Sequence, residues 1–479
     1  MQGRQFNRKL LVSVYNAQEA REAVLGGARI IDSEDPKSAL GNISPRRIMD
    51  ISDAVLDFHR DLDVQLSTNI GEDQLLFRRS QSGQAIEKSR DEIAGKAAQA
   101  ALGVCLSMGT RVNPVNIVKV GVDGMEVDRI GEVLREVVAT LRRTEALSHC
   151  QVMSVLFAQD RQLFQERRSN DAVRNQLVEL REFNPSSQGK PDAFDITKYA
   201  VNTLRDPQSD KVLFTDASQV SLQALIERGV LPDDSTGTFI RTNELFEHSK
   251  YFPQVPDADA PRTSQSVIKA MVDVTAESGA NAIMIDTSIL LKVMNVGLID
   301  TSGSEMIDIN SLVVRDGMPK RGILTLEDLR FFVQYCHYKG VSANLAGSIE
   351  SYQAQQLWAL IPELDQVSAR GAASGIDMAP SPSKATSPSN APVPGADTRK
   401  RRVIKRSLVH GMAPPEHGGV LNLPVSLKTA QGATTRVREL IVMLGEKRRA
   451  AGLPDLQAFW VDPSGNQTPI PTPLCAAAA

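Results

Sequence analysis

Short apolar runs alternate with amphipathic stretches along most of the chain. The runs are mostly rich in β-branched residues, which is typical of strands that are buried on both faces. Eight such strands are predicted, at residues 10–14, 28–33, 63–70, 117–121, 151–158, 281–287, 341–347 and 366–371. Between them, apolar residues recur at helical spacing, and several segments end in glycine just before the next strand. The clearest helices are expected at residues 17–25, 126–143, 264–277 and 325–338.

This repeated strand–helix alternation predicts an α/β fold, a (β/α)₈ TIM barrel. The alternative is an open, doubly wound sheet. That alternative is weakened because no G-x-G-x-x-G sequence follows the first predicted strand.

Two segments interrupt the alternation. Residues 71–111 lengthen the connection after the third strand, and residues 159–262 form a larger one after the fifth. Connections that follow a barrel strand emerge on the catalytic face, so an inserted subdomain over the site is expected there. A surface insertion or a contact between copies in a homo-oligomer explains the larger segment equally well. Residues 1–375 are the expected barrel domain.

The composition changes after residue 375. Residues 376–398 are rich in Pro, Ser and Ala, which predicts a disordered linker. Residues 399–479 are expected to form a small, basic, partly disordered C-terminal appendage with one helix at residues 434–450. The basic run at residues 399–406 could bind nucleic acid or an acidic partner, but a solvated charge run is favoured.

Charge and composition narrow the function classes. The net charge of −3 predicts no general attraction to nucleic acid or membranes, and an aromatic content of 5% argues against base-stacking surfaces. The longest apolar stretch, residues 282–299, is interrupted by Asp286 and Lys292, so no membrane span is expected. With no signal-peptide pattern at its start, the protein is expected to be cytoplasmic. Cysteines and histidines are scattered without metal-ligand spacing, which predicts no metal site.

Three predicted strands carry an ionisable residue at or near their carboxyl ends: Asp32, Lys119 and Asp286. A (β/α)₈ barrel builds its active site from such strand ends. A single aspartate here is more often a loop or helix cap, but a lysine inside an apolar strand is more telling. Burial is expected to lower the pKa of Lys119 toward neutrality, which suits proton transfer or imine formation.

The seventh and eighth predicted strands end in glycine-containing turns. Gly347 and Ser348 follow one strand, and Arg370 and Gly371 follow the other. These two loops commonly bind a substrate phosphate in this fold, through backbone N–H groups and a following helix N-terminus. The sequence therefore predicts a phosphorylated small-molecule substrate.

At these residues the chain resembles the (5-formylfuran-3-yl)methyl phosphate synthase family, the aldolase-like barrels of methanofuran biosynthesis. The matching blocks are LLVSVYNAQEAREAVLGGARIID with DPK just after it, IVKVGVDG, ANAIMIDTS, and GVSANLAGSI followed by SARGAASG. The resemblance covers most of residues 9–375, apart from the large insertion, and does not reach residues 376–479.

The resemblance implies a lyase that condenses two glyceraldehyde 3-phosphate molecules with loss of phosphate and water. The family reaction proceeds through a lysine imine, with no metal or organic cofactor. By this resemblance, Asp32 and Asp286 match the active-site aspartates and Lys119 matches the proton-accepting lysine. The phosphate-loop motifs fall at Gly347, Ser348, Arg370 and Gly371.

Two positions depart from the family pattern. The imine-forming lysine of the family lies two residues after the first aspartate, where this chain has Glu34, and a second family lysine is replaced by Leu290. Glutamate cannot form an imine. Lys37, Lys119 and Lys292 are the available substitutes, and Lys119 is favoured because a strand lysine is already preorganised. Glu34 would then serve as the general acid or base.

Two further functions stay open at this point. One is a barrel without catalytic activity that binds a phosphorylated metabolite and presents its insertion and tail to partners. The other is a different reaction, in which Asp32, Glu34 and Asp286 bind a divalent metal ion over a phosphorylated substrate.

Overall fold

The computed structural model describes most of the predicted barrel and the C-terminal region. The residues described are 8–35, 43–70, 77–79, 85–87, 90–107, 114–122, 127–157, 194–195, 219–220, 264–287, 296–315, 318–377 and 401–471. The expected insertion, apart from two dipeptides, and nearly all of the expected linker lie outside these residues. So do Lys37, Leu290 and Lys292.

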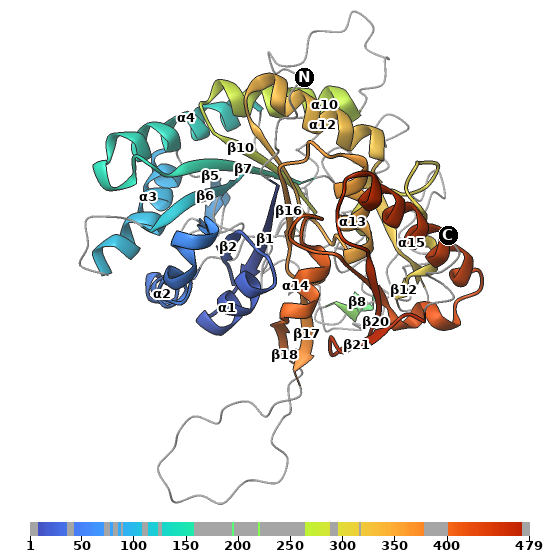
Figure 1. Ribbon diagram of the computed structural model, residues 1–479. Coiled ribbons are helices and arrows are strands. Elements are labelled where there is room, and N and C mark those ends of the chain that lie inside the picture. Colours follow the sequence, from blue (N-terminus) through green and yellow to red (C-terminus); the bar gives the residue numbers. More distant parts are fainter. Residues whose placement is uncertain are drawn as a thin grey trace, which may run out of the picture.

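Eight parallel strands close into a barrel, which confirms the predicted (β/α)₈ fold (Figure 1). They are β1 (Lys9–Val14), β2 (Ile30–Ser33), β3 (Gln65–Asn69), β6 (Val115–Gly121), β7 (Gln151–Phe157), β10 (Ala282–Asp286), β15 (Ser342–Leu345) and β16 (Gln366–Ala369). Each strand pairs with the next in this order, and β16 pairs with β1 to complete the circle. All eight predicted strands are therefore confirmed.

Helices surround the strands on the outside of the barrel (Figure 1). Those of the barrel are α1 (Ala17–Leu25), α2 (Pro45–Leu62), α3 (Arg90–Ser107), α4 (Val127–Arg143), α10 (Ser264–Glu277), α12 (Leu326–Lys339) and α13 (Ser351–Leu360). Local signals set their ends: Asn16 caps α1, Thr325 and Asp328 form a capping box on α12, and Gly340 ends α12 at φ 74°. The four helices predicted most clearly agree with the structure to within one residue.

An excursion of the chain separates β10 from α12 and was not predicted. Within residues 296–324 it contains β11 (Val296–Ile299), η3 (Asn310–Leu312), β12 (Val314–Arg315), β13 (Met318–Pro319) and β14 (Arg321–Leu324). β11 and β14 pair in parallel as a two-stranded sheet beside the barrel. Their contact is close, because a Cβ on Gly322 would lie 1.8 Å from the carbonyl oxygen of Ile299.

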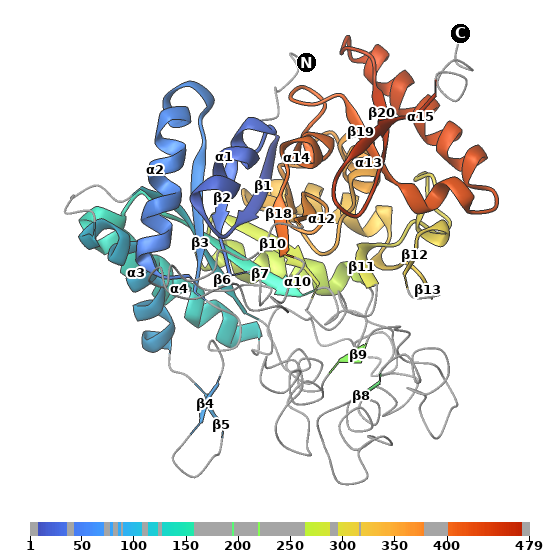
Figure 2. The same ribbon diagram turned by 90° about the horizontal axis from the view of Figure 1, so that it is seen from below.

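The described part of the expected appendage, residues 401–471, packs directly on the barrel. Its elements are β18 (Arg401–Ile404), α14 (Arg406–Met412), β19 (Val420–Pro424), η4 (Val425–Thr429), α15 (Ala433–Ala450), β20 (Gln457–Val461) and β21 (Gln467–Pro469). β18 pairs antiparallel with β17 (Ser374–Asp377), which follows the last barrel strand. Figure 2 shows this region, in orange to red, beside α13.

Side chains of α13 bind backbone carbonyl groups of this region. The indole of Trp358 donates to the Met412 carbonyl, and the Gln355 amide donates to the carbonyls of Gly411 and Ala413. Tyr352 joins one hydrophobic cluster with residues of the C-terminal sheet and of the excursion. The composition of residues 376–398 gave no indication of this packing.

Of the helices described, none is long and apolar enough to cross a membrane.

The packing of α14 predicts a contrast between two helical glycines. A Cβ on Gly411 would lie 2.2 Å from the Asn422 amide nitrogen, whereas a Cβ on Gly445 in α15 meets nothing within 4 Å. We expect Gly411→Ala to lower the free energy of unfolding by about 1–3 kcal/mol through overpacking. Gly445→Ala should raise it by about 0.5–1 kcal/mol through helix propensity. Urea unfolding of both variants measures this, and equal effects at the two sites would contradict the packing.

Candidate active site

Strand alternation explains how the ionisable residues reach the barrel interior. Ile30, Ile117 and Met284 lie in a cluster of apolar side chains that fills the barrel. Side chains two residues apart on a strand share a face, so Asp32, Lys119 and Asp286 follow them on the inner face, one step nearer the carboxyl ends. The structure therefore brings together the residues that the sequence predicts at these strand ends.

Lys119 lies between two carboxylates of β2 and the residue just after it. Its Nζ is 2.5 Å from Asp32 Oδ2 and 3.3 Å from Glu34 Oε2, with side chains that are 2%, 0% and 8% exposed, respectively. The Ser13 hydroxyl lies 3.1 Å from Asp32 Oδ2 and 3.0 Å from Glu34 Oε2. We call Lys119, Asp32, Glu34 and Ser13 the lysine–carboxylate cluster.

The electrostatics of this cluster correct the expectation for Lys119. Burial does lower the pKa of Lys119, but the charges of Asp32, Glu34 and Asp286 together with the bond to Asp32 outweigh burial. The pKa of Lys119 is consequently raised well above the ordinary lysine value. Lys119 is therefore a charged ammonium at neutral pH, so the predicted fall of its pKa toward neutrality is wrong.

The same interactions act on Asp32 in the opposite sense. Burial raises the pKa of Asp32, but the charge of Lys119 and side-chain hydrogen bonds outweigh burial and lower the pKa below its ordinary value. Asp32 Oδ1 itself has no geometric hydrogen-bond partner in the described part of the chain. Asp286, 5% exposed at the end of β10, accepts the backbone N–H of Thr287 at 2.6 Å and adds negative charge near Lys119.

The two expected phosphate loops end β15 and β16. Gly347 and Ser348 both have left-handed backbone, at φ 103° and 55°. The helix N-terminus expected to help there is already occupied, because Glu350 caps α13 with its own carboxylate. The second loop is followed by the strand β17, so no helix begins directly after it.

Arg370 connects the second loop to the cluster. Its guanidinium donates to the Ser13 carbonyl at 2.9 Å and lies 3.6 Å from a carboxylate oxygen of Glu19. The C-terminal region contributes a second cation here, because Arg402 Nη1 lies 3.6 Å from the position of a Cβ on Gly371. The structure therefore places Arg370 beside the lysine–carboxylate cluster.

Sequence reasoning missed three polar residues at this end of the barrel: Ser13, Thr287 and Lys320. The signal for Ser13 was available, since it is a polar residue on the inner face of the apolar run LLVSV. Thr287 directly follows Asp286 and carried a weaker signal of the same kind. Lys320 had none, because it belongs to the unpredicted excursion.

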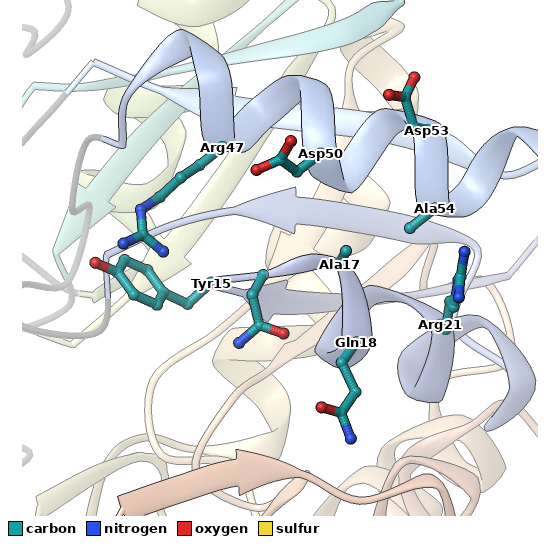
Figure 3. A pocket seen from close by; sticks show the side chains of 9 residues that line it. Tyr15, Ala17, Gln18, Arg21, Arg47, Asp50, Asp53 and Ala54 are labelled. Atoms are coloured by element: carbon teal, nitrogen blue, oxygen red, sulfur yellow. The ribbon is translucent and has the colours of Figure 1, made fainter. Parts of the chain in front are cut away.

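A cavity of about 450 Å³ lies where β1 leads into α1, and none of the residues of the lysine–carboxylate cluster lines it. It is an open groove between α1 and α2, as Figure 3 shows, and its lining includes Arg47 and Asp50 of α2 and Arg21 of α1. The Arg47 guanidinium lies 4.0 Å from the centre of the Tyr15 ring. Within the described ranges, no three His, Cys, Asp or Glu side chains are arranged to hold a metal ion.

The solved structures that match this chain are only distantly similar to it. A putative lyase/mutase from Burkholderia cenocepacia J2315 is 10% identical, with a TM-score of 0.33, covering 77% of this chain and 78% of the other. Deoxyribose phosphate aldolase from Aeropyrum pernix is also 10% identical, with a TM-score of 0.27, covering 74% and 92% of the two chains. The fold assignment rests on the closed barrel itself. No curated protein sequence matches this chain.

The match to a family model is more informative. Residues 10–179 match the model of 4-HFC-P synthase. 4-HFC-P and (5-formylfuran-3-yl)methyl phosphate are two names for one compound, so the resemblance seen in the sequence is confirmed. The matched range holds the first five barrel strands and with them Ser13, Asp32, Glu34 and Lys119. Over residues 10–179 the chain is therefore similar to the 4-HFC-P synthase family, and this match supports an enzyme of the lyase class.

Proposed function

We propose that this enzyme condenses two molecules of glyceraldehyde 3-phosphate, with loss of phosphate and water, through acid–base chemistry at Lys119 and Glu34. The observation that carries the proposal is the buried Lys119 ammonium held between Asp32 and Glu34. The family match supports the substrate class. Gly347, Ser348, Arg370 and Gly371 are the proposed phosphate contacts.

The proposed first step is enolisation of the bound aldehyde. The Glu34 carboxylate takes the proton from the carbon next to the carbonyl, and Lys119 gives a proton to the carbonyl oxygen. Glu34 suits the base because its contact with Lys119 is the longer one and its side chain is 8% exposed, whereas Asp32 is fully buried. Asp32 and Asp286 keep Lys119 charged. The ammonium then stabilises the negative charge that develops on the oxygen.

Two steps follow from the same enediol. In one step, the enediol hydroxyl on the former aldehyde carbon returns its proton to Lys119, the carbonyl re-forms and the double bond shifts, and the carbon–oxygen bond at the third carbon breaks, so that phosphate leaves with the electron pair of that bond. Addition of an enediol carbon to the aldehyde of a second triose forms the new carbon–carbon bond. For both steps the protein has to supply proton transfer and no imine, so Glu34 in place of the family lysine is compatible with this chemistry.

Turnover of glyceraldehyde 3-phosphate tests the proposal. We expect one inorganic phosphate released for every two trioses consumed, a furan aldehyde phosphate by mass spectrometry, and no effect of a chelator. Unphosphorylated glyceraldehyde is the control substrate and should not react. Tight binding of the triose phosphate without turnover would favour a non-catalytic barrel, and loss of turnover with chelator would favour the metal-assisted reaction.

A further inference from the structure

The excursion between β10 and α12 binds the loop after β15 through two carbonyl groups. The backbone N–H of Leu298 donates to the Gly347 carbonyl at 2.9 Å, and the ammonium of Lys320 donates to the Ser348 carbonyl at 2.5 Å. Both peptide groups of this turn are therefore oriented by residues that lie outside the barrel strands.

Planarity of the peptide bond fixes where the opposite side of each group points. In a trans peptide the N–H is antiparallel to the C=O, so the N–H groups of Ser348 and Ile349 face away from the excursion. Neither N–H donates a hydrogen bond within the part of the chain that the structure describes. Ile349 is buried and Ser348 is half-buried. Buried backbone donors are rarely left unpaired in proteins, so these two N–H groups are available to an external acceptor.

The side chain of Thr287 provides an independent indication. Thr287 is fully buried, and its hydroxyl has no hydrogen-bond partner among the described residues. This hydroxyl is adjacent to the turn, because a Cβ on Gly347 would lie 2.8 Å from it. A side chain on residue 347 would therefore fill the space between the turn and Thr287.

Lys320 also controls the charge at this turn. It is 5% exposed, and besides Ser348 its ammonium contacts Glu350 Oε1 at 3.2 Å and Gln353 Oε1 at 3.4 Å. Glu350 is the acidic cap of α13 and would repel a phosphate bound at the turn. Its pairing with Lys320 neutralises that charge without placing Lys320 itself on the ligand.

We infer that Lys320 is a positioning residue for a phosphate cradle formed by the N–H groups of Ser348 and Ile349 and the hydroxyl of Thr287. The inference rests on the proposed function only for the phosphorylated substrate class. The ligand group is a phosphoryl dianion, which accepts hydrogen bonds from all three donors.

Titration calorimetry with inorganic phosphate on the full chain tests the inference, and Lys9 offers a matched control. Lys9 is 9% exposed and bonds Asp63 and Gln65 at the opposite end of the barrel. We expect Lys320→Met to weaken phosphate binding at least tenfold and Lys9→Met to leave it within twofold. Equal binding by Lys320→Met and the wild type, or equal losses in both variants, would overturn the inference.

Two further variants keep the inference falsifiable if Lys320→Met does not fold. Thr287→Val keeps the side-chain shape, breaks no hydrogen bond that the described structure contains, and should weaken phosphate binding about fivefold. Adding Glu350→Gln to Lys320→Met should recover part of the lost affinity, and no recovery would refute the neutralising role. Phosphate binding that depends on Lys320 in a chain that does not turn over triose phosphate would uphold the cradle and reject the proposed function.

Discussion

Replacement of Lys119 by methionine is expected to lower the rate of α-proton exchange of glyceraldehyde 3-phosphate by at least about a thousandfold. General acid–base groups contribute about 10²–10⁴-fold to a rate, and Lys119 in addition supplies the charge that stabilises the enediolate. Exchange in deuterium oxide, followed by proton NMR, measures the step directly and does not depend on later product formation. An exchange rate within tenfold of the wild type would reject Lys119 as the proton donor.

The same variant should also be less stable, in a pH-dependent way. Removing one partner of a buried ion pair costs about 3–5 kcal/mol, because Asp32 and Glu34 remain buried without their cation. In the wild type the pKa of Asp32 is lowered, so its contribution is present above the unfolded carboxyl pKa and is lost as the pH falls through the folded one.

In Lys119→Met, the charge of Lys119 no longer offsets the burial of Asp32, so we expect the pKa of Asp32 to rise. The folded variant therefore takes up a proton on acidification and gains stability, while the wild type does not. We expect the difference in unfolding free energy between the two proteins to be smaller at pH 5 than at pH 7.5 by urea unfolding. Phosphate binding by the variant at pH 7.5 is the control for a folded barrel, and a pH-independent difference would contradict the buried ion pair.

The barrel fold and the convergence of Asp32, Lys119 and Asp286 were predictable from sequence because both depend on local alternation. A period of two along β2, β6 and β10 places Asp32, Lys119 and Asp286 on the inner face once the barrel closes. The sign of the pKa shift was not predictable in the same way. It depends on three carboxylates converging on one ammonium, and a sequence cannot show how far apart side chains on different strands lie.

The excursion and the C-terminal packing were missed for a related reason. Short strands such as β11 and β14 have weak periodicity, and their stability comes from tertiary contacts such as those of Gly322. The sequence around Gln355 and Trp358 does not indicate that their side chains donate hydrogen bonds to backbone carbonyls of α14. Composition predicted a linker and a basic run but could not show that residues 401–471 share a core with the excursion.

Glu34 adds negative charge beside Lys119, at the position where the resemblance implies the imine-forming lysine of the family. A lysine at position 34 would place a second ammonium beside Lys119, and repulsion between like charges lowers the pKa of both. The glutamate has the opposite effect, since its charge raises the pKa of Lys119. We therefore expect the residue at position 34 to influence whether imine chemistry or acid–base chemistry takes place at this strand end.

Glu34→Lys is accordingly expected to create a covalent imine site that the wild type lacks. With glyceraldehyde 3-phosphate and borohydride, intact mass spectrometry should show a stable adduct in Glu34→Lys and less than a tenth as much in the wild type. Peptide mapping should place the adduct on residue 34 or Lys119, because the two amines share the lowered pKa.

Glu34→Gln is the matched control for this variant. It removes the carboxylate without adding an amine, and Asp32 and Asp286 still keep Lys119 charged, so it should form no adduct. A wild-type adduct on Lys119 as abundant as that of Glu34→Lys would show that the ammonium loses its proton when substrate binds, and the reaction would then proceed through an imine after all.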